Sequence, residues 1–334
     1  MSTAAVRGHA TGVLGDGARL LPVDVTGYVP HPLHAGERVW AQTNCYVDLW
    51  IEVLHAAGLD PVPALSVALE ADFDGTQWTF LKLEPGDLRS LHGVTVAELN
   101  LWRPVLDHVV EELARGRLLT VEVDSFWLPD TRGTDYREAH AKTTIVVNEV
   151  DLAGLRVAYF HNDGYHAASG EDVVGLFHLA GRPPSVLLPY VEVVRLEGAH
   201  DPTPDEVVEV FIGHVAAAPV DNPVARLAAR VRDDVGWLHG AGLTEFHRWS
   251  FGVLRQCGFT AELGADACDR VAGLGVRGAA AAGTELRAAA EAAKAAQFRV
   301  ARIARGRDAD VGSSLEQMAE RWARATDHLS LLRP

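Results

Sequence analysis

The chain has 334 residues, of which 48% are hydrophobic and 22% are charged; this fits a folded protein of at most two domains and excludes a disordered or collagen-like chain. It carries 30 Lys and Arg residues against 45 Asp and Glu residues. The resulting net charge of −15 argues against general DNA binding, because it repels nucleic-acid phosphates. No apolar run reaches the roughly 18 residues of a membrane span, and the opening segment lacks the continuous apolar stretch of a signal peptide. These features, together with only three cysteines, predict a cytoplasmic protein without a disulfide framework.

A well-marked helix is predicted after a loop rich in Pro, Gly and His at 28–36. Thr43 is a suitable cap for this helix, apolar residues follow at i, i+3 and i+4 spacing, and Gly58 ends the pattern. Cys45 therefore falls in the first turn of the predicted helix.

A second helix and four strands are predicted in the rest of the first half. Thr95 and Glu98 have the spacing of a capping box, and the pattern after them predicts a helix that continues past a kink at Pro104 to about Arg115. Runs rich in β-branched and aromatic residues predict strands at 118–123, 143–147, 157–160 and 191–196.

The second half of the chain has no strand pattern. The segment 200–204 is rich in turn-forming residues, and Thr203 followed by Pro204 and two acidic residues is a strong helix start. Stretches rich in Ala and Arg then predict four or five helices, at 222–239, 244–257, 284–305 and 314–328. We therefore expect an α+β domain at 1–200 and an all-helical domain at 201–334.

Three residues of the first half form a candidate catalytic set. A thiolate in the first turn of a helix is stabilised by unpaired backbone N–H groups and the helix dipole, and Cys45 occupies that position. His140 lies at the mouth of a predicted strand, where a sheet could hold its imidazole toward a facing helix end as a base. The next strand is followed by Asn162 and Asp163, either of which could orient the imidazole.

Each candidate also has a structural interpretation. Cys45 could be a small buried hydrophobic residue, because free cysteines are commonly buried and inert. His140 could be a histidine with a purely structural hydrogen bond, and Asn162 could serve the turn before Gly164. His31 and His34 are predicted to be ordinary loop histidines.

The order of Cys, then His on a strand, then Asn or Asp resembles papain-like cysteine peptidases and acyltransferases, in which the nucleophile starts a helix and its partners lie on the sheet. A longer set of motifs resembles a bacterial domain-of-unknown-function family over about residues 20 to 200. These motifs are Pro32-Leu33-His34, Trp40-Ala41-Gln42-Thr43-Asn44-Cys45-Tyr46-Val47-Asp48-Leu49-Trp50, Glu122-Val123-Asp124, Leu128-Pro129-Asp130-Thr131, Asp135-Tyr136-Arg137, His140, Lys142-Thr143-Thr144-Ile145 and Tyr159-Phe160-His161-Asn162.

Members of that family occur beside amino acid:carrier-protein ligases and in natural-product gene clusters, and the family is more distantly similar to the acyltransferase of butirosin biosynthesis. The resemblance implies a papain-like domain with a cysteine-dependent acyl or aminoacyl transferase activity that proceeds through an acyl-enzyme on Cys45. The implied donor is an acyl carrier protein or an aminoacyl-tRNA, and the implied acceptor is a small-molecule amine. No cofactor, metal, DNA or membrane partner is expected. The alternatives are a peptidase or amidase with the same residues and a non-catalytic binding module.

Two features depart from the papain-like pattern. The nearest glutamine, Gln42, is only three residues before the cysteine, and Asn44 and Tyr46 replace the flanking small residues. Gln42 and Asn44 are the candidates for supporting an oxyanion hole, to which the backbone N–H of Cys45 would contribute one donor. The departures favour a transferase with a specialised pocket over a general protease.

Further residues are candidates for binding. Asp124, Asp130 and Asp135 flank a turn before His140 and could bind the substrate amine, with Asp124 the first candidate, and Tyr136 is a further candidate for substrate binding. Arg299 and Arg302 belong to a basic cluster with an apolar stripe opposite it. The cluster is either a solvated helix face or a docking surface for an acidic partner, such as a carrier protein with its phosphopantetheine or the phosphates of an aminoacyl-tRNA.

Overall fold

The structure is a computed structural model that describes residues 18–34, 36, 38–183 and 186–332. The described chain forms two compact units that interleave along the sequence. Unit 1 comprises the described residues within 1–35, 45–59 and 88–201, and unit 2 comprises those within 36–44, 60–87 and 202–334. Two segments of the first half, 36–44 and 60–87, belong to the same unit as the helical second half.

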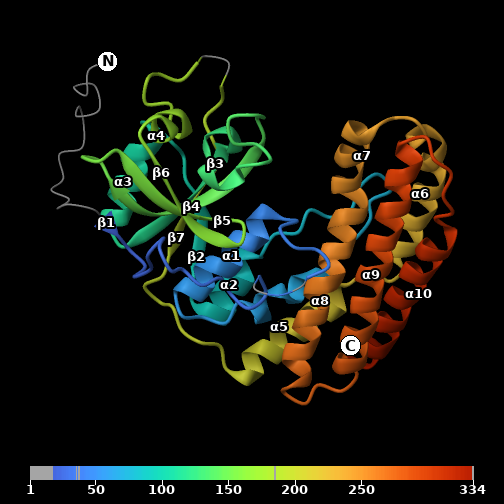
Figure 1. Ribbon diagram of the computed structural model, residues 1–334. Helices are drawn as coiled ribbons and strands as arrows, with labels where there is room; N and C mark the ends of the chain where they lie inside the picture. The colour runs from blue at the N-terminus through green and yellow to red at the C-terminus, as the bar shows by residue number, and fades with distance from the viewer. Residues whose placement is uncertain (1–17, 35, 37, 184–185, 333–334) are drawn as a thin grey trace. The chain divides into compact units, whose positions relative to one another are not determined.

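Unit 1 contains an antiparallel sheet with the strand order β2-β7-β3-β4-β5-β6, and β1 pairs with β4 (Figure 1). The strands are β1 (Ala18–Arg19), β2 (Thr95–Glu98), β3 (Arg117–Asp124), β4 (Lys142–Asp151), β5 (Arg156–His161), β6 (Gly164–Ser169) and β7 (Val191–Arg195). All four predicted strands are confirmed. Strand β6 was not predicted, because its sequence contains no β-branched residue.

The helices of this part of the chain are α1 (Cys45–Ala56), α2 (Pro85–His92), α3 (Val105–Ala114) and α4 (Glu171–Leu176). Helix α1 packs against β4, β5 and β6, and its apolar side chains Leu49, Trp50 and Val53 are fully buried. The predicted helix at Cys45 is confirmed. Thr43, however, donates its hydroxyl to the carbonyl of Trp40.

The helix predicted from the Thr95 capping box is wrong. Residues Thr95–Glu98 form β2, in which Val96 pairs with Val194 of β7. Two β-branched residues and a complete strand partner outweigh a local capping pattern here. The backbone of Pro104 is extended, with φ −52° and ψ 141°, and α3 begins only after it, so the expected kinked helix does not form.

Unit 2 is helical, as predicted for the second half of the chain. Its helices are α5 (Pro204–Ala217), α6 (Pro223–Leu238), α7 (Leu243–Ser250), α8 (Gln256–Ala272), α9 (Ala279–Ala304) and α10 (Gly312–Leu329). The Thr203 capping box at the start of α5 is confirmed. The 3₁₀-helical segment Val62–Glu70 packs against α5 and α8, and α9 packs against α8 and α10.

The helix predicted at 244–257 ends earlier and is followed by a different backbone geometry. Helix α7 stops at Ser250, a π-helical turn spans Phe251–Arg255, and α8 then continues to Ala272. Cys257 and Cys268 both lie on α8 and are buried and free.

Candidate functional site

Cys45 is the first residue of α1, and its thiol is free and partly exposed. The next residue, Tyr46, fixes where the helix starts on the sheet. Its hydroxyl donates to Glu192 Oε2 at 2.9 Å, and Thr120 Oγ1 donates to the same oxygen at 3.1 Å. Helix α1 therefore begins over β7 and β3. The thiol therefore lies at the N-terminal end of the helix, where the helix dipole favours negative charge.

His140 precedes β4 and pairs with the carboxylate at the end of β3. Its Nδ1 lies 2.6 Å from Asp124 Oδ2, and its ring stacks on Phe126 with centroids 4.5 Å apart and an interplanar angle of 13°. The side chain is 71% exposed, and within the described part of the chain its Nε2 has no hydrogen-bond partner. A carboxylate on one ring nitrogen and an open second nitrogen is the arrangement of a general base.

The helix start and the Asp124–His140 pair lie on one face of the sheet. Alternate residues of a strand project to the same side, so Thr120 and Asp124 of β3 share a face. Thr120 lies opposite Glu192 in the register of β3 and β7, and Glu192 is the residue that binds Tyr46. Thr120 and Asp124 are four residues apart along β3, which corresponds to about 13 Å. Among the described residues, no hydrogen bond joins Cys45 to His140.

Asn162 is not the partner of His140. It lies in the two-residue turn between β5 and β6 with φ +47°, and its Nδ2 is 3.5 Å from His161 Nδ1. Asn tolerates this left-handed backbone conformation better than most residues, so the position serves the turn. The orienting carboxylate of His140 is Asp124, to which the sequence had assigned a role in substrate binding.

A second Asp–His pair lies in a buried network that the sequence did not reveal. His161 Nδ1 is 2.5 Å from Asp130 Oδ2, and its Nε2 is 2.8 Å from Thr143 Oγ1. Tyr159 donates its hydroxyl to the other oxygen of Asp130 at 2.6 Å. Burial alone would raise the pKa of Asp130, but its bond to His161 and the nearby positive charge lower it overall. The network fixes the turn at Asp130 to β4 and β5.

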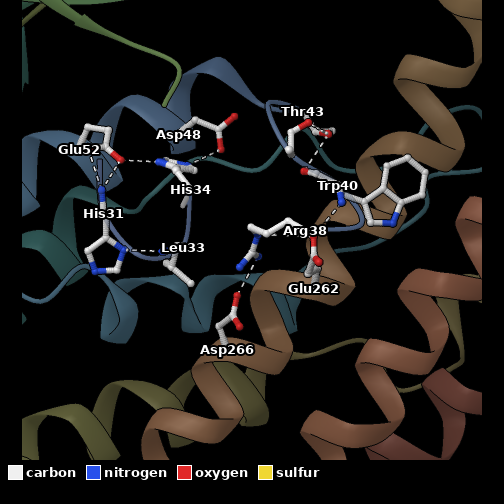
Figure 2. A network of polar contacts seen from close by, with 11 residues as sticks. His31, Leu33, His34, Arg38, Trp40, Thr43, Asp48, Glu52, Glu262 and Asp266 are labelled. Atoms are coloured by element: carbon white, nitrogen blue, oxygen red, sulfur yellow. Dashed lines mark hydrogen bonds and ion pairs between the residues drawn. The ribbon is translucent and has the colours of Figure 1, made fainter. Parts of the chain in front are cut away.

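The side chain of His34 is buried beside α1, whereas the sequence predicted an ordinary loop histidine. His34 lies between two carboxylates of the helix, with Nδ1 bound to Glu52 Oε1 and Nε2 3.4 Å from Asp48 Oδ1 (Figure 2). Burial alone would lower the pKa of His34, but its bonds to Asp48 and Glu52 and their negative charges raise it to about 9. Tyr28 donates to Glu52 Oε2 at 2.5 Å.

This cluster is aligned with the cysteine along the helix. Cys45, Asp48 and Glu52 are spaced i, i+3 and i+7, which places them on one face of α1. The one sequence pattern that could have predicted this cluster is the pair of acids on one helix face, Asp48 and Glu52, shortly after the histidines of the loop. His34 thereby ties the loop before α1 to the face that carries the thiol.

The remaining candidates have varied surroundings. Asn44 is buried and donates to Leu81 O at 2.9 Å, whereas Gln42 is exposed with a left-handed backbone, φ +48°. Tyr136 donates its hydroxyl to Asp172 Oδ2 at 3.1 Å. Arg299 lies 3.5 Å from Ser313 Oγ, and Arg302 is exposed on α9.

A cavity of about 1400 Å³ lies beside His140 in unit 1. The described residues that line it include His140, Asp124 and Lys142, but neither Cys45 nor Asn162. Part of its wall is apolar and exposed to solvent, with Trp102 and Leu187 77% and 85% exposed. The open nitrogen of His140 thus belongs to a residue that borders a space large enough for a small-molecule ligand.

The described ranges contain neither a metal-binding cluster nor a membrane-spanning helix. No group of three or more His, Cys, Asp or Glu side chains is placed there to hold a metal ion. None of the helices described is both long enough and apolar enough to cross a membrane.

Comparison with protein families identifies the class to which this fold and site belong. The DUF1839 N-terminal domain matches residues 29–196, and the DUF1839 C-terminal domain matches residues 201–331. The chain therefore belongs to the DUF1839 family, and it contains both of that family's domains. No curated protein matches the chain.

Proposed function

We propose that the protein is a cysteine-dependent acyl or aminoacyl transferase with a papain-like catalytic domain. Cys45 carries the acyl group, and His140, oriented by Asp124, moves the protons. The observation that carries this proposal is the location of the thiol at the start of α1, on the same sheet face as the Asp124–His140 pair.

The reaction would proceed in two steps. His140 accepts the proton of the Cys45 thiol, the thiolate attacks the donor carbonyl, and the donor leaves as a thiol or hydroxyl that takes the proton from His140. The amine acceptor then attacks the acyl-cysteine, His140 accepts a proton from the amine, and Cys45 is released as a thiol. Backbone N–H groups of the first turn of α1 would stabilise the oxyanion in both steps. Among the described residues no hydrogen bond joins Cys45 to His140, so the reaction requires a rearrangement on substrate binding that brings the two side chains within hydrogen-bond reach.

Thioester and ester donors suit this site better than peptides. They are already activated, so the site need not supply the stabilisation that amide cleavage requires. The cavity beside His140 offers an apolar wall for an acyl or acceptor group. The donor is an acyl carrier protein or an aminoacyl-tRNA, and the acceptor is a small amine. All three cysteines are free, which suits the reducing cytoplasm where we place the protein.

Intact-mass spectrometry after exposure to acyl donors tests the proposal directly. We expect a single acyl adduct from loaded carrier protein or from charged tRNA, and its loss in Cys45→Ala. Cys268→Ala is the matched control, because burial and the neighbouring Asp269 raise the pKa of that thiol to about 12 and it should not react. An adduct that persists in Cys45→Ala would overturn the proposal. Release of the acyl group to water, with no transfer to any amine, would indicate a hydrolase instead.

A further inference from the structure

Two partly buried cations of unit 2 have no carboxylate partner among the residues that the structure describes. Arg255 and Lys294 form no ion pair or hydrogen bond among the described residues. Other partly buried arginines of the unit are neutralised: Arg38 lies 2.8 Å from Asp266, and Arg270 lies 2.8 Å from Asp60. Unpaired charges that are removed from water are unfavourable, so this pair needs an explanation.

The pKa values of both cations are lowered, and the two positive charges repel each other. Burial lowers the pKa of Arg255, and burial together with the charge of Arg255 lowers the pKa of Lys294. Glu262 is the nearby acid and partly opposes this effect on Lys294. Its two oxygens, however, accept the backbone N–H groups of Val39 and Trp40 at 2.9 and 3.0 Å (Figure 2). The positive charge therefore remains available to a ligand.

Aromatic rings surround both cations. Lys294 Nζ lies 4.3 Å from the ring centre of the buried Trp40 and 5.9 Å from that of Phe298. Arg255 Cζ lies 5.8 Å from the ring centre of Phe251, and the rings of Phe251 and Phe80 have centroids 6.4 Å apart. Phe80, Phe251 and Phe298 are 42%, 41% and 62% exposed, so flat apolar surface is open to solvent beside the charges.

The backbone at this site is irregular and held in place. Phe251 and Arg255 are the ends of the π-helical turn between α7 and α8, a geometry that occurs frequently at functional sites. Gln297 donates its side-chain N–H to Ser250 Oγ at 3.1 Å, which ties α9 to the residue before this turn. Lys294, one turn earlier on α9, is thereby positioned relative to Arg255.

We infer that Arg255 and Lys294 form a binding site for the phosphate of a nucleotide. The guanidinium can bind two phosphate oxygens at once, and the ammonium adds a second positive charge, which matches the charge of a phosphate monoester. The exposed phenylalanine rings provide surfaces on which a base can stack. The nucleotide is either free or the end of an RNA, and both sources share this chemistry.

Calorimetric titration of the full chain with AMP tests the inference. We expect saturable binding that weakens about tenfold or more in Arg255→Gln and in Lys294→Gln, since each loses a charge-assisted hydrogen bond. Lys294→Arg keeps the charge and should bind within about threefold of the original protein. Arg305→Gln, an exposed arginine at the end of α9, is the matched control and should leave binding unchanged.

Titrations with other ligands distinguish a free nucleotide from the end of an RNA. Ribose 5-phosphate lacks the base and should bind at least about tenfold more weakly than AMP, given the stacking contribution of one base. A CCA trinucleotide that binds more tightly than AMP identifies an RNA end, whereas equal affinity identifies a free nucleotide. Stronger binding of 4′-phosphopantetheine than of AMP would overturn the assignment to nucleotides, and so would AMP binding that is unaffected by both Gln variants. Cys45→Ala should bind AMP normally, so this test stands apart from that of the transferase.

Discussion

The two Asp–His pairs of unit 1 have the same chemistry and opposite surroundings. In the Asp124–His140 pair the histidine is 71% exposed, with an open ring nitrogen beside a cavity. In the Asp130–His161 pair the side chains are 8% and 2% exposed, and both ring nitrogens of the histidine have partners. A short carboxylate–imidazole contact therefore does not by itself identify a general base. A histidine can act as a base only if its second ring nitrogen is accessible; otherwise its role is structural.

The largest expected effect is a loss of acyl-transfer rate when the exposed Asp124–His140 pair is altered. We expect His140→Ala to reduce the rate of acyl transfer by about 10³-fold, a typical loss for a general base. Asp124→Asn should reduce it by a similar factor, because the imidazole would lose the carboxylate that sets its tautomer. The free energy of unfolding should change by less than about 1 kcal/mol in either variant, since the pair is exposed. Transfer assays with urea denaturation check both values, and a full rate in His140→Ala would remove this residue from the mechanism.

The buried pair should respond in stability instead. Asp130→Ala removes the acceptor of two buried hydrogen bonds, those with His161 and with the Tyr159 hydroxyl, and each buried group left unsatisfied typically costs about 1–3 kcal/mol, so the free energy of unfolding should fall by roughly 2–5 kcal/mol. Urea denaturation followed by circular dichroism measures the loss. Thr143→Val, which removes only the neutral hydroxyl bound to His161, is the matched control and should cost about 1 kcal/mol. Equal losses in the two variants would contradict a central role for Asp130 in this network.

His34 provides a third environment, in which the histidine is buried and charged. Its pKa is raised from 6.5 to about 9, so the folded state binds the proton more tightly than the unfolded state. The resulting stabilisation, about 3 kcal/mol at most, is fully present below about pH 6.5 and is lost as the pH rises through 9. Denaturation of the wild type and of His34→Gln across this range should show the two stabilities converging at high pH. A constant difference would show that the imidazole is neutral.

The smallest effect is expected at Asn162. Glycine readily adopts the left-handed backbone conformation of this turn, so Asn162→Gly should change the free energy of unfolding by only a few tenths of a kcal/mol. The rate of acyl transfer should also be unchanged, because His140 is oriented by Asp124. A large loss of rate in this variant would restore the order of Cys, His and Asn that the sequence suggested.

Local sequence patterns predicted the position of the nucleophile better than its partners. The start of α1 and the four strands follow from short-range spacing and composition, and Cys45 could be placed from them. Asp124 could not be recognised as the partner of His140, because their contact depends on the register of β3 against β4. The same limit applies to Thr95, whose capping pattern was overridden by pairing with a strand about 100 residues later in the chain.

The candidate site shows a similar limit at His34. A histidine in a loop rich in Pro and Gly has no local signal of burial. Its charge depends on two acids of the following helix, Asp48 and Glu52, which read in the sequence as ordinary polar positions. Arg255 is comparable, because only the packed structure shows that it forms no ion pair within the described ranges.

The interleaving of the two units has a consequence for how the protein is made. Trp40 and Trp78 leave the ribosome early, yet the groups that accept their indole N–H bonds, Ala290 O and Thr260 Oγ1, are synthesised far later. During translation both indole side chains therefore remain exposed to solvent until the helical half has been synthesised. A fragment that ends at residue 200 should therefore expose both indoles and aggregate.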